Sequence, residues 1–144
     1  MAMSEPIGVV PRFPTPPAVV RAAVVAAVFS GAPSTALALV TRTDPLAAAR
    51  AAGTLLQPRR RPGSLVAGAI AHGAISLGWT TVLAAAPPGR RVRWGAIGAV
   101  VVAALDLQVI GRRYPEIHAL PFVPQLADHL AFGVLAGWVL DRSR

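Results

Sequence analysis

The sequence contains no cysteine and no lysine among its 144 residues. The lack of cysteine excludes disulfide bonds, thiolate metal ligands and a cysteine nucleophile. Acidic residues number only six and charged residues make up 14% of the chain, whereas soluble domains usually contain about 25% charged residues. Hydrophobic residues make up 54%. A chain of this composition has too little polar surface for an ordinary small soluble domain.

The arginines are confined to the gaps between long apolar runs. Four windows contain none of the 14 arginines, namely residues 22–40, 64–86, 94–110 and 124–140. A helix of such a length spans roughly 25 to 35 Å, close to the hydrocarbon thickness of a bilayer. Lipid offers the backbone no hydrogen-bond partner, so each span must be helical. We predict an all-α polytopic protein of the inner cell membrane, built as a four-transmembrane-helix bundle; a soluble all-α protein with buried helices is the alternative.

The chain divides into a tail and one domain. Residues 1–17 contain five prolines and are expected to form a flexible tail. Residues 18–144 are expected to form a single transmembrane domain. A cleaved signal peptide over residues 1–38, ending in an Ala-x-Ala site, is the alternative for the first span. The predicted spans are residues 18–40, 64–86, 92–111 and 124–141.

A glycine and a proline interrupt the first span at Gly31 and Pro33. We expect a kink there, because both residues disfavour a regular helix. The hydroxyl groups of Ser30, Ser34 and Thr35 lie beside the interruption and can bond the carbonyl groups that a kink leaves free.

Two of the connections between spans have recognisable structure. Residues 46–56 are rich in alanine and favour a helix that is too short to cross a bilayer. We predict a short interfacial helix there, between the first and second spans, with Arg50 toward water. The sequence Pro87-Pro88-Gly89 is a short turn, so we expect the second and third spans to pack against each other as antiparallel helices.

The arginines cluster at the ends of the apolar spans. A net charge of +8 could suggest a nucleic-acid partner, but no nucleic-acid-binding motif accompanies it. Arginines beside membrane spans are better explained by contacts with anionic lipid headgroups than by binding to nucleic acid. We therefore predict the lipid bilayer as partner and no nucleic acid. The expected headgroup contacts are Arg59, Arg60, Arg61, Arg90, Arg91, Arg93, Arg112 and Arg113.

These arginines do not orient the chain in the membrane. Seven would lie on the side of the two termini and seven on the other side, so the positive-inside rule gives a tie. We place both termini in the cytoplasm and leave open a dual topology or one dictated by a partner. A second copy of the chain or another membrane protein could be that partner.

Four ionisable side chains fall inside the four windows that contain no arginine: His72, Asp106, Asp128 and His129. Such groups are costly in lipid and are functional candidates by default. Counted along the helices, all four lie about 6 to 12 Å from the same membrane face. Three serines add polar atoms to this half of the membrane. The candidate intramembrane cluster therefore comprises His72, Asp106, Asp128, His129, Ser30, Ser34 and Ser76.

Helical spacing aligns several members of this cluster. His72 shares a helix face with Ser76, while Asp106 and His129 continue stripes of small residues on the third and fourth spans. If these stripes face inward, His72, Asp106 and His129 converge. Asp128 points about 100° away from His129 and could reach across to a neighbouring helix.

Two histidines with carboxylates support three kinds of chemistry. They can pass protons, because histidine titrates near neutral pH. They can bind a divalent metal, with His72, Asp106 and His129 as the ligands, although no single helix carries a pair at metal-binding spacing. They can also join helices by hydrogen bonds worth about 0.6 to 2 kcal/mol each. No phosphate-binding loop and no nucleophile with an oxyanion hole is visible, so we expect neither catalytic residues nor a cofactor.

Four stretches of the chain carry a resemblance: SGAPST at residues 30–35, DPLAAARAAGTLL at 44–56, AHG at 71–73, and DLQVIGRRYPEIHALPFVPQLADHLAFGVLAGW at 106–138. They are similar to a group of small four-span membrane proteins from high-GC bacteria that are classed as domains of unknown function. The resemblance covers most of the chain after about residue 18. It implies a bacterial integral membrane protein and carries over no activity, substrate or site residue.

Two functions of different kinds follow. The first, which we favour, is a non-enzymatic accessory or scaffold module in which the intramembrane histidines and aspartates pair the helices. The second is a small transporter or channel-like protein that moves protons, a metal ion or a small solute along the same groups. A metal-dependent intramembrane enzyme is a third and weaker alternative.

Overall fold

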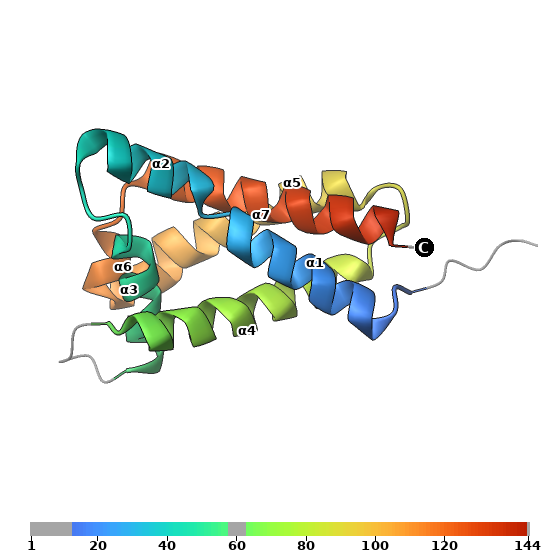
Figure 1. Ribbon diagram of the computed structural model, residues 1–144, viewed down its shortest axis with the longest axis horizontal. Coiled ribbons are helices and arrows are strands. Elements are labelled where there is room, and N and C mark those ends of the chain that lie inside the picture. Colours follow the sequence, from blue (N-terminus) through green and yellow to red (C-terminus); the bar gives the residue numbers. More distant parts are fainter. Residues whose placement is uncertain (1–12, 58–62, 144) are drawn as a thin grey trace, which may run out of the picture.

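The computed structural model describes residues 13–57 and 63–143, and all regular structure within them is helical (Figure 1). The helices are α1 (Pro16–Phe29), α2 (Ala32–Thr41), α3 (Ala47–Gly53), α4 (Leu65–Ala84), α5 (Arg91–Ala104), α6 (Pro115–His118) and α7 (Phe122–Arg142). Three short segments complete them: the 3₁₀ helix η1 (Thr54–Leu56), the π-helix η2 (Leu105–Ile110) and the 3₁₀ helix η3 (Gly111–Arg113).

Four of the helical segments in the described ranges are long and apolar enough to cross a membrane. Their mean hydropathy lies between 1.2 and 1.9, and their bounds are Pro16–Thr41, Leu65–Ala84, Arg91–Arg113 and Phe122–Arg142. These segments match the four predicted spans closely. The prediction of an all-helical chain with four membrane-length apolar spans is confirmed. Most of the predicted tail lies outside the described residues.

The first span is interrupted where the sequence predicts a kink. Helix α1 ends at Phe29 and α2 starts at Ala32, with a turn at Ser30 and Gly31 between them (Figure 1). Pro33 stands in the first turn of α2, where its missing N–H costs no helical hydrogen bond. The Ser34 hydroxyl donates a hydrogen bond to the Gly31 carbonyl at 3.3 Å, which is the kind of compensation expected beside such an interruption.

The connection after the first span contains a short helix. It appears as α3 followed by η1, and α3 packs against α4. The contact is close because Gly68 on α4 has no side chain; a Cβ there would meet the Ala49 carbonyl. At the surface, Arg50 forms an ion pair with Asp44.

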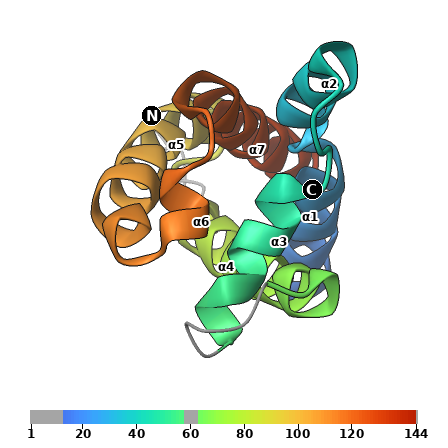
Figure 2. The ribbon, with the colours of Figure 1, turned by 90° about the vertical axis from the view of Figure 1, so that its left-hand side faces the viewer.

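The long helices are arranged in a ring. Figure 2, which looks along them, shows α4, α5, α7 and α1 in this ring, with α3 and α6 nearest the viewer. Helix α7 contacts α5, α1 and α2, and α4 contacts α1 and α3. Buried apolar residues gather in two separate clusters. One contains Val19, Ala22, Ala84, Val139 and Leu140, and the other contains Ala51, Ala103, Leu107 and Ile117.

Helices α5 and α7 approach each other at backbone distance. A Cβ on Gly95 would meet the Gly133 carbonyl, and a Cβ on Gly133 would meet the Gly95 carbonyl. A Cβ on Gly137 would likewise meet the backbone of Arg91. Glycines therefore permit this contact, as small residues commonly do between membrane helices.

Helices α4 and α5 differ from our expectation. The Pro87-Pro88-Gly89 turn joins them, yet they make few contacts with each other. The expected close packing of the second and third spans is wrong. A short turn fixes only the adjoining helix ends, and the glycines of α5 direct its packing toward α7 instead.

Candidate functional site

The carboxylate of Asp106 is presented by an irregular part of the third span. Helix α5 changes at Leu105 into the π-helix η2, which carries Asp106 in its first turn. A π-helical turn adds a residue to the helical repeat and redirects the side chains that follow, and such turns are frequent at functional sites. Here the turn places Asp106 opposite α7.

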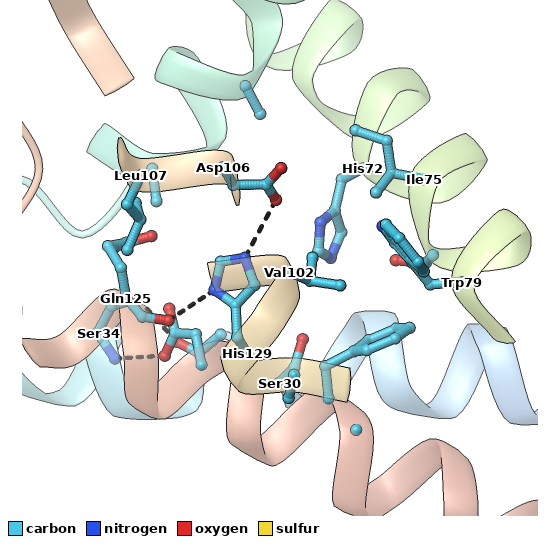
Figure 3. Close-up of a pocket in the computed structure, with 18 of the residues that line it drawn as sticks. Ser30, Ser34, His72, Ile75, Trp79, Val102, Asp106, Leu107, Gln125 and His129 are labelled. Atoms are coloured by element: carbon cyan, nitrogen blue, oxygen red, sulfur yellow. Dashed lines mark hydrogen bonds and ion pairs between the residues drawn. The ribbon is translucent and has the colours of Figure 1, made fainter. Parts of the chain in front are cut away.

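His129 on α7 joins Asp106 to the backbone of its own helix. Its Nδ1 lies 2.7 Å from the Gln125 carbonyl oxygen, and its Nε2 lies 3.2 Å from Asp106 Oδ2 (Figure 3). A carbonyl can only accept, so Nδ1 carries a hydrogen. The hydrogen bond at Nε2 then needs one further proton, which belongs either to His129 or to Asp106. In both cases the pair has no net charge, which lowers its cost inside a membrane span.

Asp128 points away from this pair and bonds α2. Its Oδ1 accepts a hydrogen bond of 2.9 Å from the backbone N–H of Ser34. Ser34 lies in the first turn of α2, where N–H groups have no helical partner, and the N-cap Gly31 has no side chain to offer. Asp128 therefore caps α2 from another helix, and its negative charge suits the positive end of the α2 dipole.

His72 on α4 bonds the other side of the same interruption. Its Nε2 donates to the Ala27 carbonyl oxygen at 3.1 Å. Ala27 lies in the last turn of α1, where carbonyl groups lose their helical partners. This contact links α4 to α1 and leaves Nδ1 of the neutral ring as a hydrogen-bond acceptor.

One cavity of about 850 Å³ connects all of these groups. Figure 3 shows His72, Asp106 and His129 around it, with Ser30 and Ser34 lower in the view. The lining includes all seven members of the candidate cluster, namely His72, Asp106, Asp128, His129, Ser30, Ser34 and Ser76, along with many apolar side chains. The structure therefore brings the cluster to one cavity but divides its hydrogen bonds among three separate contacts.

The structure does not support the metal-binding alternative. Within residues 13–57 and 63–143, no group of three histidine or acidic side chains is placed to hold a metal ion. His72, Asp106 and His129 line the same cavity. However, the Nε2 atom of His72 is turned to the Ala27 carbonyl, and that of His129 to Asp106. The three side chains are therefore not arranged to bind one metal ion.

Arg91 departs from its expected role at a lipid headgroup. The residue is 4% exposed, and its Nη1 lies 3.6 Å from Asp141 Oδ1. The guanidinium also donates to the Leu140 carbonyl at 3.4 Å and to the Ala84 carbonyl at 3.3 Å. Arg91 thus binds the C-terminal ends of α4 and α7, where carbonyl groups are free and the helix dipole favours a cation.

The other expected headgroup arginines divide into two sets. Arg90, Arg93, Arg112 and Arg113 are exposed, as headgroup contacts require. Arg59, Arg60 and Arg61 lie outside the described residues.

Sequence reasoning missed the pairing of Arg91 with Asp141 and the size of the cavity. A signal for the pair was present, because Asp141 ends the fourth span next to the face on which Arg91 begins the third. The carboxylate of Asp141 also accepts from the backbone N–H groups of Gly89 at 2.8 Å and Arg91 at 3.2 Å. It therefore fixes the turn between α4 and α5 to the end of α7.

Searches against protein-family models, curated proteins and solved structures found no match for this chain. The resemblance to small membrane proteins of high-GC bacteria stays a prediction. The function therefore has to be argued from the contacts and the cavity described above.

Proposed function

We propose that this chain is a non-enzymatic module of the inner membrane, a four-helix bundle in which histidine and aspartate side chains hold the helices together. In this arrangement α3 lies at the membrane interface, and the exposed arginines Arg90, Arg93, Arg112 and Arg113 contact anionic headgroups. The module would act as an accessory or scaffold for a second copy or for another membrane protein.

One observation carries the proposal: each intramembrane ionisable group bonds a different helix at a point where helical hydrogen bonding is interrupted. Asp128 and His72 bond the two sides of the break between α1 and α2, through Ser34 and Ala27. His129 bonds the π-helical segment η2 through Asp106. In lipid an unpaired backbone or side-chain group finds no water, so these contacts determine which helix faces which.

Thermal unfolding in mild detergent tests this proposal. We expect His129→Leu and Asp128→Ala each to lower the free energy of unfolding by about 1 to 2 kcal/mol, the upper range for hydrogen bonds between membrane helices. His118→Leu is the matched control, because His118 is exposed at the end of α6. The proposal fails if the two span variants are as stable as the control variant.

The cavity supports transport as a second candidate function. His72, Asp106 and His129 line one continuous space, and the His129–Asp106 pair shares a proton that could be exchanged. Asp106→Asn is the informative variant, since its amide can donate to His129 Nε2 and preserve the contact while removing the titratable group. Proton or solute flux in proteoliposomes that this variant stops would support transport. Flux equal to that of empty vesicles would reject it.

A further inference from the structure

The large cavity runs along most of the second span. Its lining extends on α4 from Leu65 to Leu83, a length of about 27 Å at the helical rise. Its volume of about 850 Å³ falls within the range of roughly 300 to 1,000 Å³ found for small-molecule sites. Trp79 and Trp94 lie in its wall and are 37% and 49% exposed, respectively. Such a space between membrane helices must be filled in a bilayer.

Segments of the chain line the cavity at both of its ends. At one end the lining includes α3, with Ile117 of α6 and Leu120 beyond it, and at the other it includes Ala86 and Pro87 of the turn between α4 and α5. A transmembrane helix of a partner would have to leave at both ends, since it needs about 20 residues to cross. The lining at both ends therefore favours an occupant shorter than the bilayer.

The wall of the cavity is polar only in one half. The polar half contains His72, Asp106 and His129, and the half near the turn is lined by Trp79, Trp94 and aliphatic side chains. His72 lies seven residues after Leu65, so the polar half is roughly 10 Å below the α3 end of α4. An occupant with an apolar chain and one compact polar end matches this distribution.

The hydrogen-bonding capacity of the polar half specifies the polar end. His72 uses Nε2 to donate to Ala27, so its Nδ1 is an acceptor. Asp106 uses Oδ2 for His129, and no hydrogen bond within the described residues engages Oδ1. Both residues line the cavity, so two acceptors are available there beside a pair that carries no net charge. A hydroxyl group can donate its one hydrogen to either of them, whereas a charged headgroup at this depth would be costly.

We propose that the cavity binds a single-chain lipid alcohol, with its hydroxyl group donating to Nδ1 of the neutral His72 ring and its hydrocarbon chain against Trp79 and Trp94. This inference rests on the proposed transmembrane arrangement but not on the helix-pairing role of the polar groups. It adds a ligand class to the site.

Tryptophan fluorescence can test the proposal directly. The probes are dibromostearyl alcohol and its methyl ether, which differ only in the donor hydrogen, added to protein in mild detergent. Trp138 is first replaced by Phe, because it lies outside the cavity lining and stacks on Arg142 at 4.1 Å. We expect the alcohol to quench Trp79 and Trp94 at a lower concentration than the ether does. The difference should be about three- to tenfold, which is the gain in affinity that one neutral hydrogen bond gives.

Two matched glycine variants show whether the quenching comes from the cavity. Gly98 lines the cavity and Gly78 does not, and a Cβ on either residue meets nothing within 4 Å. Gly98→Leu should fill the apolar half of the cavity and reduce quenching by both probes severalfold. The tryptophans of Gly78→Leu should be quenched as strongly as those of the parent protein. Equal quenching in the two variants would overturn the proposal.

A variant at the polar end tests the role of the hydroxyl group. His72→Phe keeps a ring but removes the acceptor, so the preference for alcohol over ether should fall to about onefold. A parent protein that does not distinguish alcohol from ether, or a His72→Phe variant that keeps the full preference, would contradict the proposal. Thermal unfolding of the same samples reports helix pairing separately, so either inference can fail alone.

Discussion

Helices α5 and α7 touch along their backbones, whereas α4 and α5, which are joined by a short turn, make few contacts with each other and both line a cavity. Gly95 and Gly133 make the first contact possible, and a side chain on either would collide with the other helix. Gly98, one turn further along α5, faces open space instead. Two positions one turn apart on the same helix therefore differ: Gly95 permits close packing against α7, and Gly98 leaves open space.

The comparison shows that proximity in sequence does not decide which membrane helices pack together. A turn of three residues holds the ends of α4 and α5 near each other, but small residues and polar contacts determine the rest of their course. The polar contacts of Asp128, His129 and His72 all lie where helices are irregular. Changes at the turn, at the close contact and at the open face should therefore have effects of different size.

The largest effect is expected at the turn, where both regions meet. Arg91→Met removes the partner of Asp141 and the cap of α4 and α7, and the loss of one member of a buried ion pair costs about 3 to 5 kcal/mol. The exposed Arg93→Met serves as the control. Unfolding by SDS titration in mixed micelles measures the change.

A second substitution separates a true pair from a general loss of stability. Because Asp141→Leu removes the carboxylate that Arg91→Met leaves unpaired, the double variant should be less destabilised than the sum of the single variants. Strict additivity of the two losses would show that the ion pair does not contribute.

The next effect is expected at the close contact between α5 and α7. Gly133→Ala adds a Cβ against the Gly95 carbonyl and should lower the free energy of unfolding by about 1 to 3 kcal/mol, as overpacking does. The same SDS titration applies. Unchanged stability would mean that the two helices are not in backbone contact.

The smallest effect, and one of opposite sign, is expected on the open face of α5. Gly98→Ala meets nothing within 4 Å, and alanine in a helix is favoured over glycine by about 0.5 to 1 kcal/mol. The variant should therefore be slightly more stable than the parent. A loss as large as that of Gly133→Ala would show that this face is packed.

The sequence predicts the helical spans well because lipid imposes the pattern: apolar runs must be long, and arginines must stay outside them. The interruption at Gly31 and Pro33 was predictable for the same kind of local reason. The convergence of His72, Asp106 and His129 on one space also followed from helical spacing. These features depend on residues that are neighbours along one helix.

The remaining features depend on which helices meet, and spacing along one helix does not contain that information. Small residues occur on several spans, so the sequence did not identify Gly95 and Gly133 as the contact. The burial of Arg91 requires Asp141, which lies 50 residues further along the chain. The π-helix at Asp106 has no marker residue of the kind that proline provides for a kink.

The coupling between His129 and Asp106 tests the central claim most directly. The free energy of unfolding should be measured for His129→Leu, Asp106→Leu and the double variant in the same detergent. If this contact pairs α7 with the third span, the two losses should be non-additive by about 1 to 2 kcal/mol. Losses that add without any coupling would contradict the claim that intramembrane histidine and aspartate contacts hold the helices together.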